Sequence, residues 1–155
     1  MKGNDKVIET LNARLVEELT AINQYMVHAE MVENWKYAKL YETIRKRAIV
    51  EMIHAEKLIE RILFLEGRPV VSKLGTVNIG AEVPQIHDND LGAEQQAVLG
   101  YNESIRIAGE AQDHGTRELL DDILKEEEGH VDWLEAQLDQ IRQAGLQNYL
   151  AEQIY

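Results

Sequence analysis

The sequence predicts an all-α protein, a four-helix bundle of two antiparallel hairpins joined by a long crossover, with a short fifth helix at the C-terminus. Apolar residues recur every three or four positions over four long stretches, which is the period of an amphipathic helix. The two prolines, Pro69 and Pro84, lie in or beside the one stretch rich in loop-forming residues, Gly67 to Gly80. A chain of 155 residues has room for one sizeable core, so we expect residues 1–155 to form a single domain.

The first predicted hairpin joins a helix from about Lys6 to Asn34 to a second helix from about Tyr37 to Leu65. The second helix should stop at Gly67, because Pro69 follows just beyond it. The apolar stripe of the first helix is Val7, Leu11, Leu15, Ile22, Tyr25 and Ala29, and that of the second is Leu40, Ile44, Ala48, Ala55, Leu58, Ile62 and Leu65.

The second predicted hairpin starts near Pro84, since proline is tolerated in a first helical turn. Asp113 is a plausible N-cap for the fourth helix, which reaches about Ala144. The third stripe is Leu91, Val98, Tyr101, Ile105 and Ala108, and the fourth is Leu120, Ile123, Val131, Leu134, Leu138 and Ile141. After Gly145, the segment LQNYLAEQI could form a fifth helix. The link between the hairpins exceeds ordinary bundle connections, so we expect it to span the length of the bundle.

Composition narrows the possible functions. Lys+Arg 16 against Asp+Glu 28 gives a net charge of −12, which repels nucleic acid and anionic membranes and attracts cations. Without cysteine there is no disulfide or thiolate chemistry, so a bound metal must use carboxylates, imidazoles or thioethers, and the first two suit iron, manganese or zinc. The sequence shows neither a signal-peptide core nor about 18 uninterrupted apolar residues, so we expect a cytoplasmic protein.

Each apolar stripe is interrupted once by a glutamate, and these four are Glu18, Glu51, Glu94 and Glu127. Histidine follows three residues later in two helices, as Glu51-x-x-His54 and Glu127-x-x-His130, so each pair projects from one helical face. Four buried carboxylates would be very costly without counter-charge, and two divalent cations remove that cost. The neighbouring Glu17, Glu126 and Glu128 fall off the stripe and are expected on the solvated surface.

The four glutamates form an internal repeat. Glu18 to Glu51 spans 51 − 18 = 33 residues, Glu94 to Glu127 again spans 127 − 94 = 33, and the halves are offset by 94 − 18 = 76. The residues Glu18, Tyr25, Glu51 and His54 then map onto Glu94, Tyr101, Glu127 and His130. This pattern is typical of a pseudo-twofold di-iron or di-manganese carboxylate site. A core of hydrogen-bonded polar residues, or a structural metal site without turnover, are the alternatives.

Specific motifs then resemble those of the bacterioferritins over nearly the whole chain. They are MKG at the start, AINQY at 21–25, EM-x-HA at 51–55, ERILFLEG at 60–67, EEGH-x-DWLE from Glu127, and GLQNYL at 145–150. The resemblance implies the ferritin-like fold and a hollow shell of twenty-four subunits built from twofold dimers, which stores a ferric mineral. It also implies a ferroxidase centre of two iron ions per subunit, formed by Glu18, Glu51, His54, Glu94, Glu127 and His130, in which Glu51 and Glu127 bridge both ions.

The resemblance gives Met52 a role that its position alone does not. Beside Glu51, Met52 points about 100° away from it, which by itself suggests core or interface packing. In the family, a methionine at this place from both subunits of a twofold dimer ligates haem iron, so haem b shared between two subunits is expected. This haem is thought to help electrons enter the mineral for iron release, and a ferredoxin-type reductase is a candidate partner.

Other residues carry weaker expectations. Tyr25 lies two turns from Glu18 and could donate an electron or hydrogen atom during oxygen reduction, although a hydrogen-bonded core tyrosine is the alternative. Trp35 and Trp133 are assigned to packing. The three histidines without metal-ligand spacing, expected at the surface or core edge, are His28, His87 and His114.

The run Arg45-Lys46-Arg47 departs from the family pattern. Many bacterioferritins carry a histidine and acidic residues around here that form an accessory iron site on the cavity wall, and Lys46 and Val50 cannot serve that role. Iron traffic at the inner surface could therefore differ, and the subunit could co-assemble with a second type of subunit. A run of three cations is otherwise typical of a solvated face.

The leading hypothesis is iron storage and detoxification by a ferroxidase that oxidises Fe(II) to Fe(III) with oxygen or hydrogen peroxide and deposits mineral in the shell. The alternative is a haem and di-iron cage that acts mainly in peroxide detoxification or electron transfer. A rubrerythrin-like peroxidase is disfavoured, because the chain has no cysteine for a rubredoxin-like domain.

Overall fold

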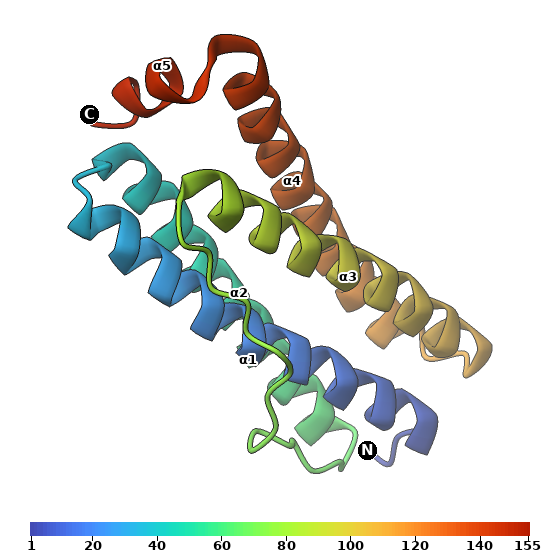
Figure 1. The fold of residues 1–155 in the computed structure, drawn as a ribbon. Helices are drawn as coiled ribbons and strands as arrows, with labels where there is room; N and C mark the ends of the chain where they lie inside the picture. Colours follow the sequence, from blue (N-terminus) through green and yellow to red (C-terminus); the bar gives the residue numbers. More distant parts are fainter.

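The computed structural model describes residues 1–155, and every regular element in it is a helix. The helices are α1 (Asp5–Asn34), α2 (Ala38–Phe64), α3 (Val83–Glu110), α4 (His114–Ala144) and α5 (Leu146–Ala151). Figure 1 shows two hairpins: α1 packs against α2, α3 packs against α4, and α1 and α3 join the two pairs. The predicted class and the predicted helix bounds are confirmed. No helix combines the length and the apolar character that crossing a membrane requires.

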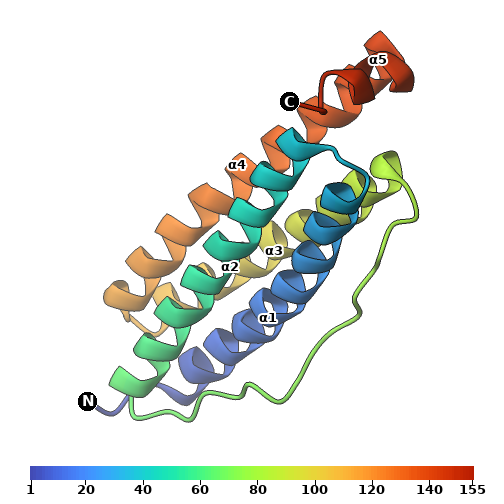
Figure 2. The same cartoon turned by 90° about the vertical axis from the view of Figure 1, so that its left-hand side faces the viewer.

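The crossover, residues 65–82, runs along the outside of the bundle for its full length (Figure 2). Side chains on one face of α1 hold it there. Thr20 Oγ1 accepts from the Gly75 N–H at 2.8 Å, and Gln24 Oε1 accepts from the Asn78 N–H at 3.0 Å. Asn12 Oδ1 likewise accepts from the Val70 N–H at 2.8 Å, and His28 Nε2 accepts from the Gly80 N–H at 2.9 Å. The link therefore returns the chain to the opposite end, and α3 runs in the same direction as α2.

Three helices end sharply at a residue with a left-handed backbone. Those residues are Lys36 (φ 68°), Glu66 (φ 61°) and Gln112 (φ 57°). In each case the following N–H returns to the last helical turn, for example from Asp113 to the Ala108 carbonyl at 2.9 Å, which is a Schellman closure. Asp113 then caps α4, because its side chain accepts from the Thr116 N–H at 3.0 Å, as predicted. The tight turns keep both hairpins antiparallel.

The buried face of the second hairpin differs from the predicted stripe. Leu91, Val98, Ile105 and Leu138 are only half-buried, and the buried positions lie one residue earlier, at Asp90, Ala97, Ser104 and Gln137. Hydrophobic periodicity missed this because three of the four are polar. Each polar side chain is satisfied inside the bundle; Ser104, for instance, lies 2.7 Å from Thr10 Oγ1.

His87 is fully buried and connects α5 to the bundle, so its expected place at the surface or core edge is wrong. Its Nε2 lies 3.0 Å from the Tyr149 hydroxyl, which itself donates to Gln137 Oε1 at 2.7 Å. The proton of the neutral imidazole therefore sits on Nε2, while Nδ1 is buried without a partner. Trp133 packs edge-on against His87, with ring centroids 5.6 Å apart.

Lowering the pH from 7 to 5 is expected to destabilise the subunit through His87. Burial, reinforced by the charge of Arg47, lowers the pKa of His87 from 6.5 to about 4. Between these values the unfolded chain binds a proton that the folded chain excludes, so stability is lost as the pH falls through this window. The loss at pH 5 should be about 2 kcal/mol. The thermal midpoint is measured at pH 7 and at pH 5. Its decrease between these two pH values should be smaller for His87→Gln than for the wild type, and an equal decrease would contradict the prediction.

Candidate metal centre

The six predicted ligands meet in the middle of the bundle, although they come from four helices. α1 contributes Glu18, α2 Glu51 and His54, α3 Glu94, and α4 Glu127 and His130. In each helix these positions lie between residues that build the two apolar clusters at either end of the bundle. The four glutamates are at most 2% exposed and His54 is fully buried, while His130 is half-buried.

The ligand atoms form two overlapping groups. His54 Nδ1 lies 2.8 Å from Glu127 Oε1, 3.3 Å from Glu51 Oε2 and 3.6 Å from Glu18 Oε1. The second group centres on His130 Nδ1, which is 3.0 Å from Glu51 Oε1 and 3.3 Å from Glu94 Oε1. Glu51 and Glu127 belong to both groups, and the ligand atoms of each group lie within 4.8 Å of one another. This spacing suits ligands about 2 Å from one of two adjacent ions.

Unpaired polar atoms distinguish this cluster from an ordinary polar core. Each of the six ligand residues has one buried oxygen or nitrogen without a hydrogen-bond partner; these residues are Glu18, Glu51, His54, Glu94, Glu127 and His130. Buried polar atoms normally have such partners, and six exceptions in one place fit a cation-binding site. The alternative of a core satisfied by helix-to-helix hydrogen bonds is therefore disfavoured.

The electrostatics of the cluster also favour cations. Burial raises the pKa of Glu127 to about 12 and that of Glu18 well above its usual value. Burial would also raise the pKa of Glu51, but the neighbouring Glu18 and the two histidines hold it well below its usual value. Burial opposes the charged form of His130, yet the neighbouring carboxylates of Glu51 and Glu94 raise its pKa to about 9. Without metal, the cluster therefore retains protons. Bound cations would displace these protons.

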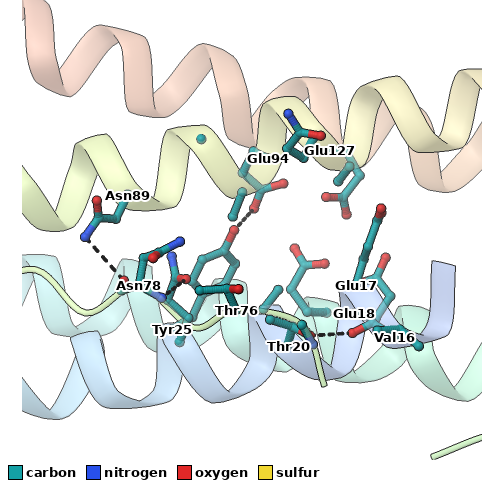
Figure 3. A pocket seen from close by; sticks show the side chains of 18 of the residues that line it. Val16, Glu17, Glu18, Thr20, Tyr25, Thr76, Asn78, Asn89, Glu94 and Glu127 are labelled. Carbon is teal, nitrogen blue, oxygen red and sulfur yellow. Dashed lines mark hydrogen bonds between the residues drawn. The ribbon is translucent and has the colours of Figure 1, made fainter. Parts of the chain in front are cut away.

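Two tyrosines cross between the halves of the cluster. The Tyr25 hydroxyl donates to Glu94 Oε1 at 2.7 Å (Figure 3), and the Tyr101 hydroxyl donates to Glu18 Oε1. The internal repeat predicts that Tyr25 and Tyr101 occupy equivalent positions, and the structure shows that each contacts the glutamate of the other half. The sequence alone indicated no function for Tyr101.

A cavity of about 430 Å³ leads to the cluster between α1, α3 and the crossover (Figure 3). The four clustered glutamates line it, and so does Glu17. Glu17 was expected on the solvated surface, but burial raises its pKa to about 7 against the opposing charge of Arg14. Glu126 is exposed as expected, yet its Oε2 lies 3.4 Å from His54 Nε2. A carboxylate in this position can orient a ligating imidazole.

A second buried polar cluster lies beside Tyr25 and corrects two expectations. Arg47, taken with its neighbours as part of a solvated face, is only 4% exposed and donates to Asp90 Oδ2 at 2.6 Å. His28, expected at the surface or core edge, is fully buried with Nδ1 2.7 Å from Asp90 Oδ1. Gln24 Nε2 donates to the same Asp90 oxygen at 2.9 Å. The sequence analysis did not single out Asp90, although it lies one turn before Glu94 on the same helical face.

Met52 points away from the metal cluster, as predicted, and is 45% exposed. Ile49 and Ile53, beside it on α2, are 37% and 41% exposed, and Met26 on α1 is 51% exposed. The thioether is thus available to a group outside the bundle, with apolar side chains near it in the sequence.

The bundle and the carboxylate–histidine cluster define a ferritin-like protein, and the family model described as a ferritin-like domain matches residues 8–144. A bacterioferritin of Brucella melitensis is 42% identical over 96% of this chain and 92% of the relative. A bacterioferritin of Mycobacterium leprae is 38% identical over 98% and 96%, and a bacterial ferritin of Synechocystis sp. is 40% identical over 99% of both. The chain therefore belongs to the bacterioferritin family, and this membership supports a role in iron storage.

Proposed function

We propose that the chain, as a single domain, is an iron-storage ferroxidase whose centre consists of the six clustered carboxylate and histidine residues. The observation that carries the proposal is the convergence of two equivalent groups of buried ligand atoms, with unpaired oxygens and nitrogens, at the centre of one bundle. Ferrous ions are the substrate, two per subunit. Oxygen or hydrogen peroxide accepts their electrons, and the ferric product is deposited as mineral.

In this proposal each side chain has a defined task. Glu18 and His54 hold one ferrous ion, and Glu94 and His130 hold the other. Glu51 and Glu127 contact both ions, because they are the two residues common to both groups. The buried negative cluster favours Fe(III) over Fe(II), since added positive charge is better compensated there. The cavity beside Glu17 gives ferrous ions and oxidant a path from outside the bundle.

We further propose a shell of twenty-four subunits built from twofold dimers, with haem b bound between two Met52 residues. An exposed thioether fits this ligand role, because a twofold axis presents the same residue twice. Bound haem would supply a path for electrons from a ferredoxin-type reductase to stored iron. Co-assembly with a second subunit type remains compatible with this arrangement. A stable monomer in light scattering would contradict the shell.

An anaerobic titration followed by oxygen tests the ferroxidase proposal. We expect two Fe(II) bound per subunit, and oxidation on admission of oxygen. Measuring oxygen and peroxide consumed per iron separates the two candidate functions. Oxidation that proceeds with peroxide but not with oxygen would favour the alternative, a cage acting mainly in peroxide detoxification. Absence of both Fe(II) binding and oxidation would reject a ferroxidase.

Met52→Leu is expected to abolish haem absorbance while the shell and most of the ferrous oxidation remain. The physical reason is that leucine fills a similar volume but cannot ligate iron, whereas the buried metal cluster does not include the exposed Met52 side chain. Reductive iron release should also slow. Reconstitution with excess haem, followed by absorption spectroscopy, measures the effect. Met31→Leu is the matched control, because Met31 packs against the core. A wild-type protein that binds no stoichiometric haem would make Met52 an ordinary interface residue.

A further inference from the structure

Two buried tyrosines make equivalent contacts with the metal cluster. Tyr25 of α1 reaches across to Glu94 of α3, and Tyr101 of α3 reaches across to Glu18 of α1. Both rings are at most 1% exposed. Their separation in sequence, 101 − 25 = 76, equals the 94 − 18 = 76 between the two glutamates that they contact. The two hydroxyls are therefore related by the same pseudo-twofold symmetry as the two proposed iron positions.

The charge around the two rings is also alike. The Arg47 guanidinium carbon lies 4.6 Å from the centroid of the Tyr25 ring, and that of Arg14 lies 5.9 Å from the centroid of the Tyr101 ring. A cation over a buried ring disfavours the positive charge that the ring would carry after losing an electron. Either tyrosine can therefore lose an electron only together with its phenolic proton. The hydrogen bond from each hydroxyl to a carboxylate gives that proton a direction in which to leave.

We infer that Tyr101 is a second redox-active tyrosine, equivalent to Tyr25, and that the pair together with two ferrous ions supplies all four electrons needed to reduce oxygen to water. The inference rests on the proposed ferroxidase function. In the balanced step, two Fe(II), one O₂, two tyrosines and two protons give two Fe(III), two waters and two neutral tyrosyl radicals. The O–O bond breaks, and the two phenolic protons end in water.

Further substrate restores the tyrosines. Each radical takes one electron from another ferrous ion and one proton from solvent, so the complete cycle oxidises four Fe(II) per O₂. With one tyrosine missing, the two ferrous ions and the remaining tyrosine supply three electrons, so water and one radical form only in turnovers in which a further ferrous ion gives the fourth electron. In the other turnovers the two ferrous ions reduce oxygen by two electrons, which gives hydrogen peroxide and no radical. The second tyrosine therefore limits peroxide release inside an iron-filled protein.

The test uses the assembled protein, loaded anaerobically with two Fe(II) per subunit and then mixed with oxygen. Rapid freezing and electron paramagnetic resonance measure tyrosyl radical, and a peroxidase-coupled assay measures hydrogen peroxide. The variants are Tyr25→Phe, Tyr101→Phe and the double variant. Tyr41→Phe is the matched control, because Tyr41 is a half-buried tyrosine packed against the apolar cluster away from the metal site. Anaerobic Co(II) titration reports whether the ligands still bind a cation.

Tyr25→Phe should retain a radical signal that the double variant lacks. Tyr101→Phe should lose roughly half of the wild-type radical and release at least about threefold more peroxide per iron, with Co(II) affinity changed less than about twofold. The inference is overturned if Tyr25→Phe forms no tyrosyl radical or if Tyr101→Phe matches the wild type in radical and peroxide. Weaker Co(II) binding with an unchanged radical would assign Tyr101 to positioning Glu18. A wild type that oxidises no iron would instead reject the ferroxidase itself.

Discussion

Glu18→Ala, Glu94→Ala and His130→Ala are each expected to slow ferrous oxidation at least about tenfold while leaving the shell assembled. Each change removes an atom that would hold one of the two ferrous ions, so the ions are no longer kept together. Little apolar core is lost, and the metal-free protein is relieved of one buried polar group. The initial rate of iron oxidation, followed by absorbance after mixing with oxygen, measures the effect.

Glu128→Ala provides the matched control for these variants. Glu128 is the neighbour of Glu127 on α4 but is exposed, and it belongs to neither group of ligand atoms. Its variant should oxidise iron at the wild-type rate. Unchanged initial rates in the three ligand variants would defeat the assignment of the cluster as a ferroxidase centre, even if the protein still stored iron.

Asp90→Ala is expected to lower the free energy of unfolding by about 3–5 kcal/mol, the usual cost of removing one partner of a buried ion pair. The Asp90 carboxylate accepts from Arg47, Gln24 and His28, and without it the buried Arg47 charge has no counter-ion. The thermal midpoint should fall by roughly 10 °C. Gln24 and His28 would also lose their hydrogen bonds to α3, although they would keep their hydrogen bonds to the backbone of the crossover.

Two further variants separate this charge effect from simple loss of a side chain. Asp88→Ala, two residues earlier and exposed, should leave the midpoint almost unchanged. Adding Arg47→Met to Asp90→Ala removes the unpaired charge and should recover part of the lost stability, as a double-mutant cycle would show. A midpoint for Asp90→Ala equal to that of Asp88→Ala would mean that water or another group compensates Arg47.

Much of the candidate site could be predicted because its pattern is local and repeated. Glu51-x-x-His54 and Glu127-x-x-His130 each lie on one helical face, and a single offset relates the two halves. Glutamates that interrupt apolar stripes are rare without a compensating partner, so the four pointed to one buried cluster. The structure brings all of them together with the spacing that two ions need, while their role as iron ligands stays a prediction.

The errors concern polar residues whose partners lie far away in sequence. Arg47 stands in a run of cations that resembles a solvated face, and its partner Asp90 is 90 − 47 = 43 positions away. His28 and His87 lack metal-ligand spacing, yet both are buried because α3 and α5 supply hydrogen-bond partners. A buried polar side chain is stable only when such a partner is in place, and periodicity along one helix does not report it.

The sequence by itself determined the helices, the two hairpins, the crossover and the identity of the clustered ligands, because helical periodicity, capping and the internal repeat depend on short-range spacing. Only the tertiary structure decided that Tyr101 contacts Glu18 and that Asp90 neutralises Arg47. It also decided that Glu17 and Glu126 lie beside the metal cluster. These features depend on how neighbouring helices are rotated and offset against one another, which the packing of the whole bundle fixes.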